Sequence, residues 1–149
     1  MNGRNARTLK LTALGVVGFH FLAVALHSAA HEALSVKATA GQLAFIIPVI
    51  IFAPVAAGFM LLRFERAGAA LLLASMLGSF VFGVYYHFVA DTIDHVAHVA
   101  RMGPASWSAV FRATAYLLAV SEAAGAGAAG LLAAAGPRSF NRYATRTGF

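Results

Sequence analysis

The chain has 149 residues, of which 60% are hydrophobic and 11% are charged, and it contains no cysteine. Soluble domains carry roughly 25% charged and about 45–50% apolar residues, so this composition indicates one membrane domain, without disulfides, thiolate metal ligands or a cysteine nucleophile. The formal net charge of +6 comes from basic residues at the ends of apolar segments, which is typical of topology signals and argues against nucleic-acid binding.

Four apolar runs follow one another, and each is long enough to cross a bilayer as a helix, which takes roughly 20 residues. The first run follows a basic segment and contains a cleavage-like Ser28-Ala29-Ala30. The apolar region of a signal peptide is shorter, about 7–15 residues, so we interpret this run as the first membrane span. The predicted spans cover residues 11–31, 42–62, 67–100 and 106–135, and a basic cytoplasmic tail follows at 136–149.

The second and third spans have features that a plain apolar helix lacks. Pro48 and Pro54 lie inside the second span, where each removes a backbone donor and is expected to kink the helix. A charged turn at residues 63–66 leads into the third span. That span continues as a polar-patterned stretch to about Ala100, so we expect its helix to project beyond the hydrocarbon.

The basic residues divide unequally between the two ends of the spans. Eight fall on one side and three on the other, which places both termini in the cytoplasm. Short connections favour antiparallel, up-down-up-down neighbours. The sequence therefore predicts an all-α, integral membrane four-helix bundle in a bacterial-type inner membrane. The eight residues are Arg4, Arg7, Lys10, Arg63, Arg66, Arg138, Arg142 and Arg146, and the three are Lys37, Arg101 and Arg112.

The first span carries a stripe of histidines. At about 100° per residue, His20, His27 and His31 lie at about 0°, −20° and +20° around the helix, and the last two form an HxxxH pair one turn apart. A polar group of this kind is expensive when it faces lipid. We therefore expect the stripe to face the interior of the bundle.

A second stripe lies in residues 85–101, at the end of the third span. If the helix continues through this segment, four side chains fall on one face and His95 lies at the edge of that face. The charge count places this segment and the end of the first span on the same, extracytoplasmic side, so the two stripes should face each other. The four side chains are those of His87, Asp91, Asp94 and His98.

The two stripes together predict a metal centre between the first and third helices. Imidazole and carboxylate groups suit zinc, copper or iron, and bundle cores recruit ligands from facing helices. Three or four ligands complete a site, and the remaining groups would orient the imidazoles or hold a second ion. Redox or hydroxylation chemistry fits such a centre, but whether the protein is an enzyme stays open. The predicted ligands are His27, His31, His87, Asp91, Asp94, His95 and His98, with Glu32 as a secondary candidate.

Glu122 lies near the middle of the fourth span, at a depth similar to that of His20. An ionised carboxylate is costly there, so Glu122 should be either protonated or paired, and His20 is the expected partner. Two interpretations stay open for this pair. It is a proton carrier or inner ligand, or it is a neutral hydrogen bond between helices.

Other functions remain as alternatives to a metal centre. A haem b electron-transfer subunit or a quinone site would pair His20 or His27 with His87, although the acids on the same face suit a divalent ion better. A proton or solute pathway would use the same stripes without a metal. A small accessory or assembly subunit, or a homo-oligomer, would use the small-residue face of the fourth span for close helix packing. That face carries Gly125, Gly127 and Gly130.

Two short patterns resemble known families. The HxxxH pair His27 and His31, with the HxxH pair His95 and His98, resembles the histidine boxes of membrane fatty-acid desaturases and hydroxylases. Those families have further boxes, larger cytosolic caps and a cytosolic cluster, which this chain lacks. The pair Asp91 and His95 is similar to one in the copper-binding subunits of membrane methane and ammonia monooxygenases. Each resemblance covers two to four residues, and we assign the chain to neither family.

Overall fold

Residues 3–135 are described in a computed structural model, and over this range the chain forms helices joined by short connections. Four helical segments are long and apolar enough to cross a membrane. The prediction of an all-α protein with four membrane-length helices is therefore confirmed, whereas the predicted tail at 136–149 lies outside the described residues. The four segments are Arg4–Ala33, Ala40–Arg63, Glu65–Val89 and Ala105–Ala134.

Six α-helices and two π-helices make up this part of the chain. The first long segment is a single helix, the second and third each combine α- and π-helix, and a very short helix precedes the last segment. In chain order they are α1 (Gly3–Ala33), α2 (Ala40–Phe45), η1 (Ile46–Phe52), α3 (Ala53–Arg63), α4 (Glu65–Val84), η2 (Tyr85–Val89), α5 (Val96–Val99) and α6 (Ala105–Ala134).

A Schellman motif ends α1. The Val36 N–H donates to the His31 carbonyl at 3.0 Å and the Ser35 N–H donates to the Glu32 carbonyl at 3.1 Å, which is the paired pattern of that motif. Ser35 has φ 56, the left-handed conformation that the motif requires and that glycine adopts more readily. The motif turns the chain back so that Val36 lies beside the His31 side chain.

The two prolines of the second segment lie in and next to η1. A capping box starts the segment, with the Thr39 hydroxyl and the Gln42 side chain each accepting from the other residue's backbone N–H. Pro48 is inside η1 and Pro54 is in the first turn of α3. The Ala53 N–H reaches back five residues to the Pro48 carbonyl. The expected distortion is therefore a π-helical stretch within a continuous helical segment.

The third segment ends earlier than the sequence indicates. We expected one helix over residues 67–100, but helical structure stops at Val89 and Ala90 has an extended ψ of 136. Asp and Thr are weak helix formers because their side chains bond nearby backbone groups. Here the Thr92 hydroxyl donates to the Tyr86 carbonyl at 3.3 Å. Residues 90–95 consequently form a non-helical connector that leads into α5.

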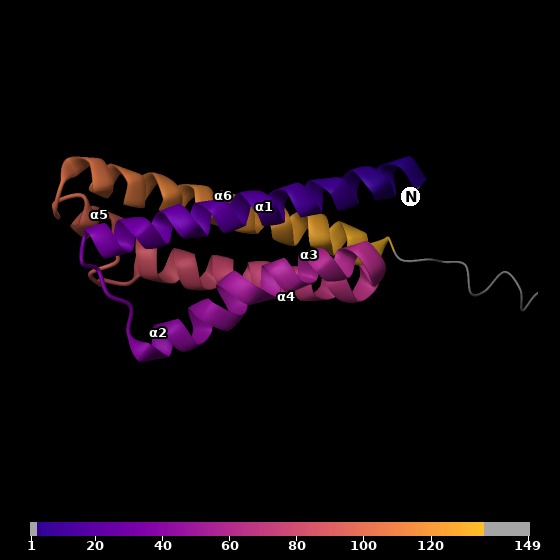
Figure 1. The fold of residues 1–149 in the computed structure, drawn as a ribbon, viewed down its shortest axis with the longest axis horizontal. Helices are drawn as coiled ribbons and strands as arrows, with labels where there is room; N and C mark the ends of the chain where they lie inside the picture. The colour runs from indigo at the N-terminus through magenta and orange to yellow at the C-terminus, as the bar shows by residue number, and fades with distance from the viewer. Residues whose placement is uncertain (1–2, 136–149) are drawn as a thin grey trace, which may run out of the picture.

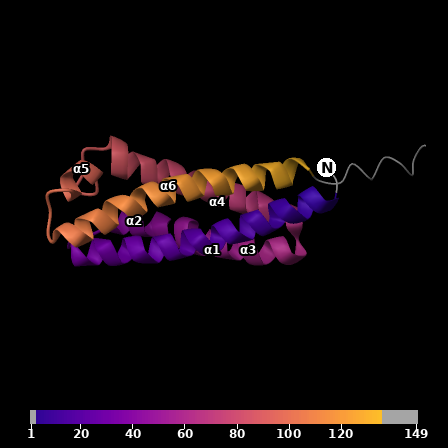
Figure 2. The same ribbon diagram turned by 90° about the horizontal axis from the view of Figure 1, so that it is seen from above.

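The long helices pack side by side, as Figures 1 and 2 show. α6 packs against both α1 and α4, and α3 packs against α4. The start of α1, the α3–α4 turn and the end of α6 lie at one end of the bundle, and the α1–α2 connector and α5 lie at the other. α2 and η1 lean away from the other helices at this second end (Figure 1). The first end holds the largest apolar core, which includes Leu61, Leu72 and Met76.

The outer surface is strongly apolar. Leu22, Phe59 and Val120 are 68%, 71% and 68% exposed, respectively. Side chains of this size are rarely exposed together on a protein surrounded by water, so lipid contact explains them best. Gly127 lies on this open surface. Gly125 is used differently, because a Cβ there would lie 3.0 Å from Met76 of α4, so this glycine serves packing within the chain.

Candidate metal centre

His27, His31 and His87 lie together in the half of the bundle that carries the α1–α2 connector. Each offers one potential ligand atom, and these three atoms lie within 4.8 Å of one another. Among the described residues, no other group of three or more histidines and acids lies this close together. The ring of His27 lies 4.8 Å from that of His31 and 4.9 Å from that of His87, measured between centroids. These three predicted ligands, from α1 and η2, could hold one metal ion.

Backbone carbonyls fix two of the three imidazoles. His31 Nδ1 lies 3.0 Å from the Val36 carbonyl oxygen, and His87 Nδ1 lies 3.0 Å from the Asp94 carbonyl oxygen. A carbonyl only accepts, so Nδ1 donates in both cases and carries the ring proton. The Nε2 atom of each neutral ring therefore has a free lone pair. Ligating histidines usually donate their second nitrogen to an acceptor in this way.

Thr114 fixes the third imidazole. Its Oγ1 lies 2.8 Å from His27 Nδ1 and 2.7 Å from the Val110 carbonyl oxygen. The single hydroxyl proton is donated to the helix carbonyl, so Oγ1 accepts from His27 Nδ1–H. His27 consequently has the same tautomer as the other two rings. Three separate acceptors, from the α1–α2 connector, the segment after η2, and α6, orient the three rings alike.

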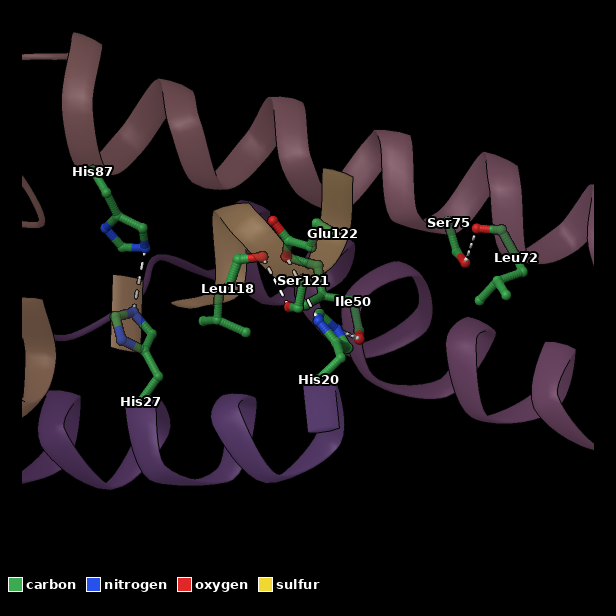
Figure 3. Close-up of polar contacts among 9 residues, drawn as sticks. All are labelled: His20, His27, Ile50, Leu72, Ser75, His87, Leu118, Ser121 and Glu122. Atoms are coloured by element: carbon green, nitrogen blue, oxygen red, sulfur yellow. Dashed lines mark hydrogen bonds and ion pairs between the residues drawn. The ribbon is translucent and has the colours of Figure 1, made fainter. Parts of the chain in front are cut away.

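The spacing of the nitrogens suits a metal ion. His27 Nε2 lies 3.3 Å from His87 Nε2 (Figure 3). Two lone pairs at this distance repel each other unless a cation lies between them. Tetrahedral coordination with metal–nitrogen bonds of about 2.0–2.1 Å separates two ligand nitrogens by about 3.3–3.4 Å. The observed distance equals that separation and slightly exceeds the usual range for an N–H hydrogen bond.

The surroundings of the three histidines are partly apolar and partly acidic. His27 and His87 are buried, and the Phe111 ring of α6 lies 4.5, 4.8 and 5.4 Å from the rings of His27, His31 and His87. The side chain of Asp94 is also buried, and its Oδ1 has no hydrogen-bond partner among the described residues. A carboxylate here would partly balance the charge of an ion held by three neutral rings.

The remaining predicted ligands lie apart from this group. Asp91 is fully exposed and lies 3.3 Å from His98 Nε2, while His98 Nδ1 bonds the Thr92 carbonyl at 2.8 Å. His95 accepts from the Ala97 N–H and caps α5. Glu32 pairs with Lys37 on the surface. These side chains are held by local partners and lie outside the group formed by the three histidines.

His20 and Glu122 form a second buried polar group, deeper in the bundle. His20 Nδ1 lies 3.9 Å from Glu122 Oε1, and the two side chains are 2% and 3% exposed. His20 Nε2 donates to the Ile50 carbonyl at 3.1 Å (Figure 3). Pro54, four residues after Ile50, has no N–H to offer that carbonyl. His20 and Glu122 are therefore neighbours, as expected, but the distance between them is longer than a hydrogen bond.

Sequence reasoning missed the groups that orient the rings. Thr114 was detectable as a hydroxyl inside an apolar span, although nothing in the sequence indicates that it faces His27. Val36 acts through its carbonyl oxygen, which has no sequence signal. Phe111 looks like any other apolar residue of the fourth span. Asp94 was predicted as a side-chain ligand, whereas its backbone carbonyl is the atom that contacts His87.

Comparison with protein-family models, curated proteins and solved structures finds no match to this chain. Its function is therefore inferred from the residues and their geometry.

Proposed function

We propose that this protein is an integral membrane metalloprotein that binds one divalent transition-metal ion through His27, His31 and His87. One observation carries the proposal. Each ring donates Nδ1 to its own oxygen acceptor, so three Nε2 lone pairs are left for a common ligand. Imidazole ligands suit zinc, copper and iron, and three protein ligands leave a coordination position for water or a substrate. Redox or hydroxylation chemistry is compatible with such an open position.

The geometry supports a non-haem ion better than haem b. An iron with two axial histidines separates their nitrogens by about twice a metal–nitrogen bond, ~4 Å, with the macrocycle between them. His27 and His87 instead lie 3.3 Å apart at Nε2, with His31 against the same pair. There is no gap between these rings for a macrocycle. An absorption spectrum of the purified protein distinguishes the two cofactors, because haem gives an intense Soret band.

The orientation in the membrane is part of the proposal. The basic residues at residues 4–10 and 63–66 support a cytoplasmic location for that end of the bundle, in a bacterial-type inner membrane. The three histidines would then lie near the extracytoplasmic face. Accessibility of an engineered cysteine at Ser35, in the α1–α2 connector, to a membrane-impermeant thiol reagent in intact cells tests this orientation. Protection of that cysteine until the cells are lysed would contradict it.

Metal content provides the direct test. The purified protein, loaded with zinc and freed of excess metal, should retain about one ion per chain. His27→Ala, His31→Ala and His87→Ala should each lose it. The matched control is the double variant His95→Ala/His98→Ala, which removes two histidines from the same end of the bundle and should retain the ion. Loss of metal in the control, or retention in the three single variants, would contradict the proposal.

A further inference from the structure

A single cavity of about 280 Å³ connects the three histidines with Glu122. Its mouth lies at the α1–α2 connector, where Glu32 and Lys37 line it. It passes His27, His31 and His87 and continues between η1, α4 and α6 to Ser79 and Glu122. Its location follows from the fold, because α2 and η1 lean away from the other helices at this end (Figure 1).

The cavity ends inside the bundle. Beyond Ser79 and Glu122, the helices are joined by the closed apolar core that contains Leu61, Leu72 and Met76, each 0% exposed. A passage across the membrane would have to cross this core. The arrangement therefore suits a molecule that enters and stays, and it argues against a continuous ion or proton pathway.

The walls and the floor of the cavity differ in chemistry. Between the histidines and the floor, the walls are mainly apolar, with Ile46, Phe82 and Leu118 among them. At the floor, Ser79 Oγ and Glu122 Oε2 are buried and have no hydrogen-bond partner among the described residues. A buried polar atom without a partner destabilises the folded protein, because it has lost its hydrogen bonds to water. Two such atoms at the end of an apolar cavity call for a ligand with a hydrogen-bonding group at one end.

The length of this ligand follows from helix geometry. Ser79 precedes His87 by eight residues on the α4–η2 segment, and His20, beside Glu122, precedes His27 by seven residues on α1. At 1.5 Å per residue, the floor lies about 10–12 Å deeper than the three histidines. Figure 3 shows this separation, with His27 and His87 on one side and His20 and Glu122 on the other.

We propose that the cavity binds an elongated apolar molecule, about 10 Å long, that ends in one hydroxyl or carbonyl group. That group bonds Ser79 and Glu122, and the apolar end lies next to the three histidines. A neutral carboxyl group both donates and accepts, and so does a serine hydroxyl, so the floor accommodates either end group. The inference names the ligand class of the metal centre and so rests on the proposed function.

Photolabelling of the zinc-loaded protein in lipid nanodiscs tests the ligand class. The probe is an octanol that carries a diazirine, and the labelled residues are mapped by mass spectrometry. Label should concentrate in residues 43–50, 79–87 and 115–122, which contribute to the cavity. Excess octanol should prevent labelling about tenfold more effectively than octane, which corresponds to about 1.4 kcal/mol from the hydrogen bonds that only octanol makes at the floor. Label spread over lipid-facing residues, without protection, would overturn the inference.

Two sets of variants locate the binding. Gly83→Leu should abolish protected labelling, since a Cβ at Gly83 lies 3.6 Å from Glu122 Oε2 and the larger side chain fills the floor. Gly127→Leu is its matched control on the open surface, and it should label as the wild type does. Ser79→Ala with Glu122→Gln should reduce the preference for octanol over octane. If the double variant fails to fold, Ser79→Ala alone keeps the comparison.

Metal content of the same samples separates this inference from the proposed function. Unprotected labelling in a protein that retains zinc would overturn the ligand inference alone. Protected labelling in a protein that binds no zinc would overturn the metal centre and leave a cavity for an apolar alcohol. A preference that survives both Gly83→Leu and Ser79→Ala would show that the probe binds elsewhere and would also overturn the inference.

Discussion

His27, His31 and His87 come from α1 and η2, and their orienting partners come from three further places in the chain. His95 and His98 lie three positions apart, at the start and in the middle of α5, and bond to nearby residues. His98 Nδ1 bonds the Thr92 carbonyl, and its Nε2 lies 3.3 Å from Asp91 Oδ1, so both ring nitrogens face local oxygen atoms. In the first group, by contrast, Nδ1 of every ring faces an oxygen acceptor, and the Nε2 lone pair is left for a metal ion.

The difference shows what makes a cluster of histidines suitable for a metal. Residue density is higher in the exposed group, where Asp91, His95 and His98 lie within residues 91–98. Among the residues that the structure describes, only the first group brings histidines from separate helices together. Its rings also have fixed tautomers, and two of them are buried. A preorganised set of lone pairs binds an ion without the cost of reorienting side chains.

Removing one histidine from each group should give the largest difference in zinc-dependent stability. At a free zinc concentration about a hundred times the Kd, a bound ion stabilises the folded protein by about 2.7 kcal/mol. His87→Ala should lose this zinc-dependent stabilisation, and His98→Ala should keep it. Thermal unfolding in detergent, with and without zinc, measures both. Equal losses in the two variants would mean that the exposed group belongs to the site.

Acidification should release the ion. Each imidazole must be neutral to bind, so protons compete with the metal and affinity falls as the pH falls. The log of the zinc Kd should therefore rise in the wild type as the pH falls from about 8 to about 5. His98→Ala should show the same pH dependence. Zinc competition with a chromogenic chelator over this range measures the Kd at each pH. A zinc affinity that did not change with pH would contradict a site built from histidines.

Thr114→Val should weaken metal binding without removing a ligand. The substitution keeps the side-chain shape but removes the oxygen that accepts from His27 Nδ1. Loss of such an orienting partner typically costs about 10–100-fold in metal affinity. Thr8→Val is the matched control, because its hydroxyl donates to the Arg4 carbonyl at the other end of α1. Isothermal titration with zinc compares the two, and equal affinities would remove Thr114 from the site.

Part of this arrangement could be predicted from the sequence. Apolar runs of sufficient length give the number of membrane segments, and the helical phase of His27 and His31 correctly places both on an interior face. His87 follows from the same reasoning, because the helical segment persists to Val89.

The rest depends on contacts that no local pattern contains. The phase argument for Asp91, Asp94 and His98 assumed a continuous helix, but helical structure stops at Val89, and the Thr92 hydroxyl bonds the Tyr86 carbonyl in the connector that follows. Thr114 faces His27 only because α6 packs along α1, 87 residues away in sequence. The partners of His31 and His87 are carbonyl oxygens, which every residue has. Such contacts are visible only once the helices are placed.

Ser35→Gly is expected to give the smallest effect, and it tests how α1 holds His31. Ser35 has φ 56 at the end of α1, where an L-residue is strained by about 1 kcal/mol relative to glycine. Glycine should therefore raise the free energy of unfolding by about 0.5–1 kcal/mol after its greater freedom in the unfolded chain is counted. Ala29→Gly is the matched control. It places glycine at an exposed position inside the same helix and should lower stability by about 1 kcal/mol.

Ser35→Val should be destabilising and should also weaken zinc binding, because the same turn presents the Val36 carbonyl to His31. If Ser35→Val left zinc affinity unchanged, the turn at the end of α1 would not be what orients the His31 ring.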